Sequence, residues 1–302
     1  MSFLKKRPYI AFILPGLIVY ATFVILPLFN SIYYSFFDWN GIGPMTFIGL
    51  ENYQALLFDA RLSRIFFNAV GNNLRYVLAA LTVIMPTQIL LAYFLFLRIR
   101  GYRVFQMLIF MPFVLSSAIV AFFSMITFDP NIGILNTVLD AIGLERFAGS
   151  WYGDPRKSFF LLVGTAMWQG MGVGMMIFLA NLKSVSDDLF EAAVIDGANG
   201  FRQFFSIALP SMMPSLTNVI VLSTIFGLTI FELPYIIGGA QGGVNNSLDF
   251  INVMFYRNTF SGMHGGDTAM GFGASITTVL FFIVFAVALI QLTILNRIRL
   301  EE

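Results

Sequence analysis

The chain reads Glu191-Ala192-Ala193-Val194-Ile195-Asp196-Gly197-Ala198 between two long apolar segments, and the same polar stretch closes on Ile207-Ala208-Leu209-Pro210. Residues 183–211 hold more acidic than basic side chains: Asp187, Asp188, Glu191 and Asp196 against Lys183 and Arg202. A loop that lies on an anionic membrane surface is normally rich in Lys and Arg. Because this loop has the opposite balance, we expect it to dock on a protein.

Local signals within this loop predict two short helices joined by a turn. Ser186 or Asp187 is a suitable N-cap for the first helix. The second helix is expected over residues 201–209, with Pro210 ending it. The apolar face of the first helix consists of Leu189, Phe190, Ala193 and Val194. Two helices of this size bury too little surface to be stable alone, so they need a partner surface.

Composition places the rest of the chain in a membrane. Hydrophobic residues make up 58% and charged residues 11% of the 302 residues, and the mean hydropathy is +0.82. Six apolar segments are long enough to cross a hydrocarbon core of roughly 30 Å. They lie near residues 9–36, 69–97, 104–128, 158–182, 212–237 and 269–295. We therefore predict an all-α polytopic membrane protein of about six transmembrane helices, with one transmembrane domain over residues 1–302.

The first apolar segment is expected to stay in the protein as an uncleaved helix. It is longer than the apolar region of a signal peptide, contains Pro15 and Pro27, and has no cleavage site of the Ala-x-Ala type.

The positions of Lys and Arg predict the orientation, because short cytoplasmic loops carry an excess of both. Three basic groups would share one side: Lys5, Lys6 and Arg7; Arg98, Arg100 and Arg103; Arg297 and Arg299. That side is the cytoplasm, and an even number of spans places both termini there. The loop 183–211 then also lies in the cytoplasm.

Several function classes are disfavoured by composition. The net charge of +1 gives no clustered basic surface for nucleic acid. With no cysteine and the single histidine His264, we expect neither a metal site nor catalytic residues. The Gly-Gly-Ala-Gln-Gly-Gly run at residues 238–243 lacks the Lys-Ser/Thr of a phosphate loop, so the chain is not expected to hydrolyse ATP.

With its Glu-Ala-Ala, Asp-Gly-Ala and Ile-x-Leu-Pro elements, the loop 183–211 resembles the EAA loop of inner-membrane permeases of binding-protein-dependent ABC importers. Three further stretches resemble sugar permeases of the maltose/multiple-sugar type. They are Ser31-Ile32-Tyr33-Tyr34-Ser35-Phe36-Phe37-Asp38-Trp39, Phe47-Ile48-Gly49-Leu50-Glu51-Asn52-Tyr53 and Phe231-Glu232-Leu233-Pro234-Tyr235. The resemblance covers most of the chain. The extra N-terminal helices and large periplasmic insertion of the maltose permease are lacking, so the chain is similar to its shorter six-span relatives.

The resemblance implies partners. A bacterial or archaeal permease of this type pairs in the inner membrane with a second homologous permease. Both EAA loops insert into a cytoplasmic ATPase dimer, which binds ATP and Mg²⁺, whereas the permease itself binds no cofactor. An extracytoplasmic sugar-binding protein selects the sugar. The residues implied in coupling to the ATPase are Asp188, Phe190, Glu191, Ala192, Ala193, Asp196, Gly197 and Ala198.

Roles for three of these residues follow from their chemistry. Glu191 would give a charge-assisted contact to the ATPase, and Phe190 would help to fill its cleft. Gly197 would allow a backbone approach that a Cβ would block.

Candidate residues for the substrate path combine aromatic rings with amide, hydroxyl and carboxylate groups, which suit the ring faces and hydroxyls of a sugar. They are Trp168, Gln169, Asn218, Thr229, Glu232 and Tyr235. Glu232 is the one acid deep inside an expected span, where a charge is costly. It either lines a polar path or reaches water at the helix end. The helix-breaking residues within the spans are interpreted as allowing close packing or as breaking helices along the path. They are Pro86, Pro112, Pro234 and the glycines of residues 170–174.

Two polar and aromatic groups are interpreted as marking the membrane–water interface. The first is Asn72, Asn73 and Arg75, and the second is Trp39, Trp151 and Tyr152.

Two other function classes would leave different patterns in the sequence. An ion-coupled secondary transporter usually shows inverted repeats and several intramembrane ionisable groups, and a membrane enzyme needs a catalytic constellation. Neither pattern is present. Within the importer class, glycerol phosphate would favour more basic residues along the path and polyamine more acidic ones. Neither excess is visible, and the sequence favours a permease subunit for a sugar or oligosaccharide.

Overall fold

The computed structural model describes residues 8–260 and 269–300, and it is almost wholly helical. Within that part of the chain the only strands are β1 (Phe37–Asp38) and β2 (Thr46–Phe47), which pair antiparallel. The all-α prediction is confirmed. Lys5, Lys6 and Arg7 of the predicted cytoplasmic side, and the single histidine His264, lie outside the described residues.

Five helices of the described chain are long and apolar enough to cross a membrane, and one bent helix pair would make six. The five run over Phe12–Tyr34, Leu62–Phe96, Pro155–Leu182, Met213–Gly238 and Met270–Ile294. They coincide with five of the six predicted segments, although the second begins at Leu62 rather than at residue 69. The bent pair falls in the remaining segment, so the prediction of a polytopic membrane protein is confirmed.

Internal contacts divide the chain into two compact units. The first unit comprises Met1–Phe66 and Phe255–Phe282. It contains α2 (Pro8–Tyr20), η1 (Ala21–Ile25), α3 (Leu26–Tyr34) and α4 (Glu51–Phe58), together with parts of α16 (Ile251–Phe260) and α17 (Met270–Leu300). No residue of its apolar window within Phe12–Tyr34 is buried, which suits a helix surrounded by lipid or by a partner.

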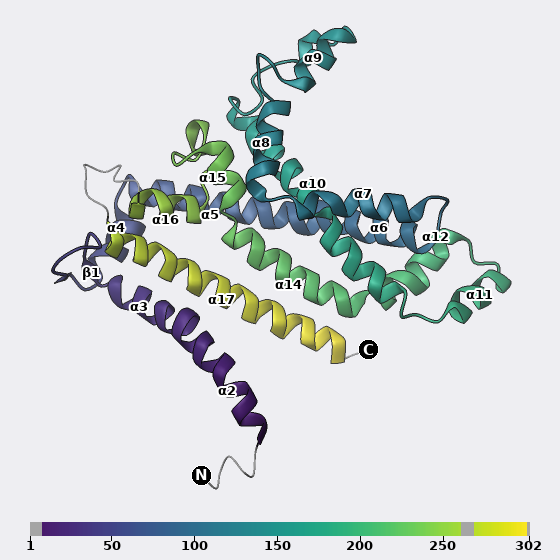
Figure 1. Cartoon of the computed structure of the whole chain (residues 1–302), viewed down its shortest axis with the longest axis horizontal. Coiled ribbons are helices and arrows are strands. Elements are labelled where there is room, and N and C mark those ends of the chain that lie inside the picture. The colour runs from purple at the N-terminus through teal and green to yellow at the C-terminus, as the bar shows by residue number, and fades with distance from the viewer. Residues whose placement is uncertain (1–7, 261–268, 301–302) are drawn as a thin grey trace. The chain divides into compact units, whose positions relative to one another are not determined.

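The second unit comprises Phe67–Met254 and Ile283–Glu302 and carries the candidate site. Its long helices are α5 (Leu62–Ala79), α6 (Met85–Phe96), α7 (Tyr102–Val114), α10 (Pro155–Leu182) and α14 (Met213–Thr229). Figure 1 shows α6, α7 and α10 running alongside one another. A buried core joins α6, α10 and the start of α14, with Tyr93, Phe178, Leu182, Phe204 and Met212 among its members.

Glycines of α10 let neighbouring helices approach closely. A Cβ added at Gly172 would lie 2.7 Å from the Cα of Phe110 on α7, and one added at Gly174 would collide with the amide of Gln88 on α6. At Gly164 and Gly170 an added Cβ would meet nothing within 4 Å. The close-packing interpretation of residues 170–174 is therefore confirmed for Gly172 and Gly174 and is wrong for Gly170.

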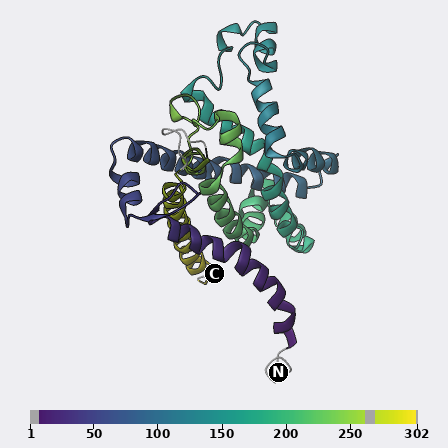
Figure 2. The ribbon, with the colours of Figure 1, turned by 60° about the vertical axis from the view of Figure 1, so that its left-hand side comes forward.

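The predicted third span, 104–128, is not one straight helix. It consists of α7 and α8 (Ser117–Thr127), which meet at an angle of 101°. Leu115 and Ser116 adopt extended backbone angles, and the Ser116 side chain accepts a hydrogen bond from the N–H of Ile119 at 3.4 Å. Ser116 is thus the N-cap of a new helix. Figures 1 and 2 show α8 leading away from α7 toward α9 (Ile134–Ala141).

Three prolines in the helical segments directly follow π-turns. η1 ends two residues before Pro27, η2 (Ala80–Ile84) two before Pro86 and η4 (Phe204–Ala208) two before Pro210. A π-turn widens the helix and makes room for a proline ring that would clash with the carbonyl four residues earlier. The prediction that Pro210 ends its helix is therefore wrong, because α13 (Leu209–Ser211) continues toward α14.

Candidate functional site

The loop 183–211 folds into two short helices whose N-caps are local side chains. In α11 (Asp187–Ile195), Ser186 Oγ accepts the N–H of Asp188 at 3.3 Å. In α12 (Gly200–Gln203), Asn199 Oδ1 accepts the N–H of Arg202 at 2.9 Å. These oxygens satisfy amides that a helix N-terminus otherwise leaves free. The helix–turn–helix prediction is confirmed, and we refer to residues 186–208 as the EAA segment.

Gly197 closes α11 with a left-handed backbone, at a φ of +78°. Its N–H donates to the carbonyl of Val194 at 3.0 Å, and the N–H of Ala198 donates to the carbonyl of Ala193 at 2.8 Å. This pair of bonds is a Schellman motif, in which glycine is favoured because it has no Cβ. A Cβ added at Gly197 would meet nothing within 4 Å of this chain. Inside the chain, glycine is therefore needed for its conformation, and the close approach of a partner stays a prediction.

One side of α11 packs against the chain itself. The ring of Phe190 is half-buried, with its centre 5.0 Å from that of Phe96 on α6. Nearby, the buried Tyr93 donates its hydroxyl proton to the carbonyl of Gly200 at 2.9 Å. Phe190 thus anchors α11 to α6, and its contact with a partner's cleft stays a prediction.

The other side of α11 is exposed and carries both apolar and acidic side chains. Leu189 is 55% exposed, Val194 62% and Ile195 86%. Among the remaining residues predicted to couple to the ATPase, Asp188, Glu191, Ala192 and Asp196 are exposed, whereas Ala193 and Ala198 are half-buried. An exposed Ile beside carboxylates is a surface that gains free energy by docking on a protein.

Two of the predicted path residues lie on α10 beside the α7–α8 break. Gln169 Nε2 donates to the carbonyl of Leu115 at 3.3 Å and approaches Ser117 Oγ at 3.4 Å, so it satisfies backbone freed by the break. Trp168 is half-exposed and lines a cavity of about 410 Å³ between α8 and α10. The cavity is largely apolar, with Phe123, Ser124, Phe160 and Thr165 among its other lining residues.

The fifth span is also broken, and this break positions two of the path candidates, the acidic Glu232 and the aromatic Tyr235. The backbone leaves the helical region at Ile230 and Phe231, and α15 (Glu232–Gly238) then begins. The ring of Pro234 excludes the carbonyl of Ile230, four residues earlier, as a helical acceptor. Glu232 is exposed in the first turn of α15, and Tyr235 lies half-buried one turn further on. Glu232 therefore lies in the first turn of a helix rather than in the middle of a continuous span.

Asn218 and Thr229 lie on the exposed side of α14. With Leu222 and Phe226, at spacings of four, four and three residues, they form one helical stripe of exposed side chains. The six predicted path residues thus occupy three elements, α10, α14 and α15. The break between α7 and α8 lies beside α10, and the break at Ile230 and Phe231 lies between α14 and α15.

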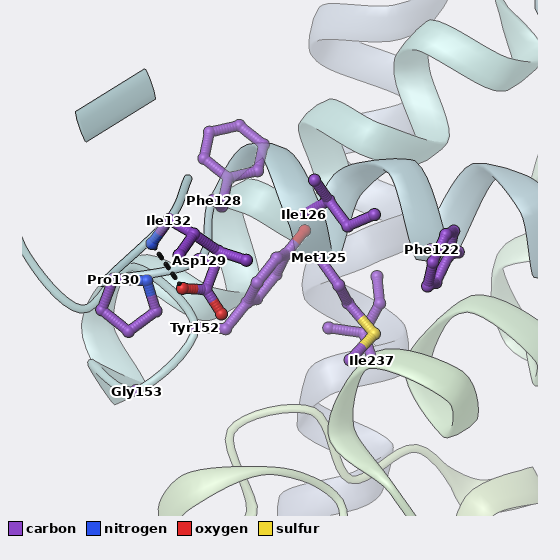
Figure 3. A pocket seen from close by; sticks show the side chains of 10 residues that line it. All are labelled: Phe122, Met125, Ile126, Phe128, Asp129, Pro130, Ile132, Tyr152, Gly153 and Ile237. Carbon is purple, nitrogen blue, oxygen red and sulfur yellow. Dashed lines mark hydrogen bonds between the residues drawn. The ribbon is translucent and has the colours of Figure 1, made fainter. Parts of the chain in front are cut away.

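A second cavity, of about 300 Å³, lies between α8, the loop that follows it and α15 (Figure 3). Asp129 Oδ1 accepts the N–H groups of Asn131 at 2.8 Å and Ile132 at 3.0 Å, and these bonds hold the pKa of Asp129 below its usual range. Burial raises the pKa of Tyr152, whose hydroxyl bonds Ser124 Oγ at 2.5 Å. Tyr152 is thus a half-buried wall of this cavity.

Asn72 and Asn73 are only 2% and 0% exposed, so the interpretation as interfacial anchors is wrong for both. Asn73 Nδ2 donates to the carbonyls of Gly227 at 2.8 Å and Leu228 at 3.0 Å, and its Oδ1 accepts the N–H of Ile251 at 3.0 Å. The sequence held a signal for this arrangement, because adjacent amides in an apolar helix are costly unless they are hydrogen-bonded.

No group of three His, Cys, Asp or Glu side chains in the described part of the chain is arranged to hold a metal ion.

Comparison with known proteins gives the family. Residues 84–299 match the family described as the inner membrane component of binding-protein-dependent transport systems. A probable ABC transporter permease, YurN of Bacillus subtilis, is 30% identical over 95% of both chains. The arabinooligosaccharides transport system permease AraP of Bacillus subtilis is 31% identical over 95% of this chain and 88% of its own.

The fold is also found in a solved structure of a bacterial alginate ABC transporter in complex with an alginate pentasaccharide-bound periplasmic protein. That similarity has a TM-score of 0.82 at 20% identity and covers 98% of this chain and 97% of the other. With its apolar helices and its match over residues 84–299, the chain belongs to the family of inner-membrane components of binding-protein-dependent transport systems.

Proposed function

We propose that this chain is one permease subunit of an ABC importer for a sugar or oligosaccharide and forms half of the translocation path. The observation that carries the coupling role is the EAA segment, which has an exposed face around Ile195 and is fixed to α6 by Phe190 and Gly200. The name of AraP, a relative similar over nearly the whole chain, supports a carbohydrate as the substrate class.

In this proposal the EAA segment docks on a separate cytoplasmic ATPase, which binds ATP and Mg²⁺ and performs the hydrolysis. Val194 and Ile195 fill an apolar cleft of that subunit, and Glu191 makes a charge-assisted contact at its edge. Phe190 transmits the force of docking to α6, because its ring packs on Phe96.

The proposed orientation places the EAA segment and both termini in the cytoplasm. Arg98 and Arg100 lie between α6 and α7, and Arg103 lies in the first turn of α7, at the same ends of these helices as the EAA segment. This agrees with the excess of basic residues in cytoplasmic loops. A second homologous permease completes the path, and an extracytoplasmic sugar-binding protein delivers the sugar.

The first test is purification of the tagged chain from its native membranes in mild detergent, with mass spectrometry of the proteins that accompany it. We expect an ATPase, a second permease and a sugar-binding protein. Calorimetry of the recovered binding protein should detect maltotriose, arabinotriose or an alginate trisaccharide, and not glycerol 3-phosphate or spermidine. Repeated recovery of the folded chain without an ATPase would overturn the proposal.

A variant tests the coupling role within the same complex. Gly197→Asp should leave the chain in the membrane and uncouple ATP hydrolysis from sugar uptake. Gly143→Asp is the matched control, because Gly143 closes α9 in the same motif, with a φ of +75° and open space around it. Normal uptake by the Gly197 variant would contradict the assignment.

A further inference from the structure

Three asparagines of α5 bind backbone groups of α14, of α16 and of the turn that leads to α16. Asn68 Nδ2 donates to the carbonyl of Asn246 at 2.9 Å. Asn72 Nδ2 donates to the carbonyl of Asp249 at 2.9 Å and lies 3.2 Å from that of Asn246. We call Asn68, Asn72 and Asn73 the asparagine clamp. Its partners are backbone groups more than a hundred residues away, so the clamp is a tertiary device rather than a local turn.

The clamp satisfies backbone groups that the broken span leaves free. The last carbonyls of α14, including those of Gly227 and Leu228, have no partner within their own helix. The Nδ2 group of Asn73 donates hydrogen bonds to both carbonyls. The Oδ1 atom of the same amide accepts the first N–H of α16, that of Ile251. One buried side chain therefore holds the end of one helix and the start of another at fixed positions on α5.

Asn72 is itself oriented by a neighbour. Arg75, one turn further along α5, donates to Asn72 Oδ1 at 3.3 Å, and this leaves the Nδ2 group directed at the turn. Asn252 adds a bond from the other side, because its Nδ2 donates to the carbonyl of Thr229 at 2.7 Å. The carbonyls of Gly227, Leu228 and Thr229 at the end of α14 thus each have a defined partner on α5 or α16.

The same helical path continues from the clamp to the EAA segment. Residues 68–96, which we call the strut, run through α5, η2 and α6 without leaving the helical region. From Asn73 to Phe96 the strut spans roughly 35 Å at 1.5 Å per residue. Its far end carries Phe96 against Phe190 and Tyr93 against Gly200.

Clamp, strut and EAA segment together form one connected set of packed and hydrogen-bonded contacts. Pro86 does not interrupt the strut, because the π-turn η2 accommodates its ring. Gln88 fastens the middle of the strut to α10 through the carbonyl of Gly170, at 3.1 Å. A displacement of α11 can therefore be carried as a rigid movement to the break at Ile230 and Phe231.

We propose that Asn72 and Asn73 are positioning residues that make the strut a mechanical link between the EAA segment and the broken fifth span. The inference deepens the proposed function and rests on it, because the movement of the strut comes from the ATPase. Without the clamp, hydrolysis continues at the ATPase but the break no longer responds to it.

The test uses the whole complex purified from native membranes, with Val244→Cys as a reporter. The chain has no cysteine, so this thiol is the only one it carries, and Val244 is exposed in the clamped turn. With the clamp intact, ATP with vanadate should change the rate of labelling by a membrane-impermeant maleimide several-fold. In Asn73→Asp, which keeps the acceptor for Ile251 and loses both donations, labelling should not respond to ATP while hydrolysis persists.

The readout separates positioning from a merely structural role. If the residue has only a structural role, its variant lowers the amount of complex. The complex that still assembles then keeps the wild-type ratio of labelling with ATP to labelling without ATP. If Asn73→Asp does not assemble, Asn68→Ala removes a single bond, and Tyr93→Phe removes the bond to Gly200 at the far end. Both should reduce the ratio toward one. Thr293→Ala is the control with an unchanged ratio, because Thr293 is exposed on α17 and its hydroxyl donates to the carbonyl of Leu289 in the same helix.

Two outcomes distinguish a failure of the proposed function from a failure of the proposed mechanical link. A complex with an intact clamp whose labelling ignores ATP would overturn the proposed function, and the strut with it. A complex that responds to ATP, and still responds to the same extent in the assembled Asn73, Asn68 and Tyr93 variants, would overturn the strut alone.

Discussion

Two polar segments flank α14, and they are held in opposite ways. The EAA segment before it is capped by its own neighbours, Ser186, Gly197 and Asn199, and leaves Ile195 86% exposed. The turn at residues 239–250 after it is fixed by amides from α5, and its residues Leu248, Asp249 and Phe250 are at most 1% exposed. A segment that keeps its shape by local bonds can present a free face to a partner. A segment held by distant side chains moves only with the helix that holds it.

The largest expected effect is at Gly242, in the clamped turn. Its φ is +73°, and an added Cβ would lie 2.5 Å from the Cβ of Asp249 and 2.7 Å from its Cα. Gly242→Ala therefore combines a left-handed conformation with overpacking, which together cost about 2–5 kcal/mol. Thermal unfolding of the purified complex should show a clear loss of stability. Gly242→Asn should not rescue it, since asparagine tolerates the backbone and still lacks the space.

The second effect is at Gly197, where the backbone is left-handed but the surroundings are open. Gly197→Ala should cost about 1–2 kcal/mol from the conformation alone, and Gly197→Asn should recover most of that stability. Gly143 is again the matched control for stability. Sugar uptake by the same variants tests whether a partner lies against Gly197. If a partner lies against Gly197, the Asn variant is stable yet inactive, whereas Gly143→Asn transports normally. Full uptake by Gly197→Asn would show that no partner backbone approaches this residue.

The contrast between the two segments also explains what could be predicted from the sequence. The bounds of α11 follow from Ser186 before it and Gly197 after it, because N-caps and Schellman glycines act within a few residues. The apolar spans were predictable because their signal is composition over a long window. The contact of Phe190 with Phe96 could not be predicted in this way. The spacing of Phe190 gives an apolar face but does not say whether this chain or a partner covers it.

The breaks and the clamp were harder to predict from the sequence, because they depend on tertiary partners. Ser116 is an N-cap signal and Pro234 a helix-breaking one, yet both sit in apolar runs that predict continuous spans. For Asn73, the sequence shows only that a buried amide needs partners. Its acceptors at Gly227 and Leu228 lie more than 150 residues away, and no spacing rule links them. The six substrate-path candidates lie on three elements, and no spacing rule in the sequence links these elements either.

The third effect separates docking from folding. Ile195→Ser removes a side chain that is 86% exposed, so the stability of the permease should change by less than about 0.5 kcal/mol. The amount of ATPase that co-purifies should nevertheless fall, because an apolar contact at the docking face is lost. Ile142→Ser is the control: Ile142 is 62% exposed at the end of α9 and has no proposed ATPase contact. Equal ATPase recovery with both variants would argue against the proposed docking face.

The smallest effect concerns local bonding in the loop after α8. Asp129 and Asp59 each accept two backbone N–H groups, and these bonds lower both pKa values from 3.8. Because the folded pKa lies below the unfolded value, the stabilisation is full above the unfolded pKa and is lost as the pH falls through the folded one. Both carboxylates are solvent-exposed, so the change should be confined to local amide protection.

Hydrogen exchange at the amides of Asn131 and Ile132 measures this directly. In the wild type their protection should fall at acidic pH, after correction for intrinsic exchange rates. Asp129→Asn keeps an acceptor oxygen that does not titrate, so protection should become independent of pH, whereas Asp129→Ala should lose it at every pH. The amides of Arg61 and Leu62 on Asp59 serve as an internal reference in all three proteins. Persistent pH dependence in Asp129→Asn would mean that a group outside this turn controls it, and the turn would then resemble the clamped segment rather than the EAA segment.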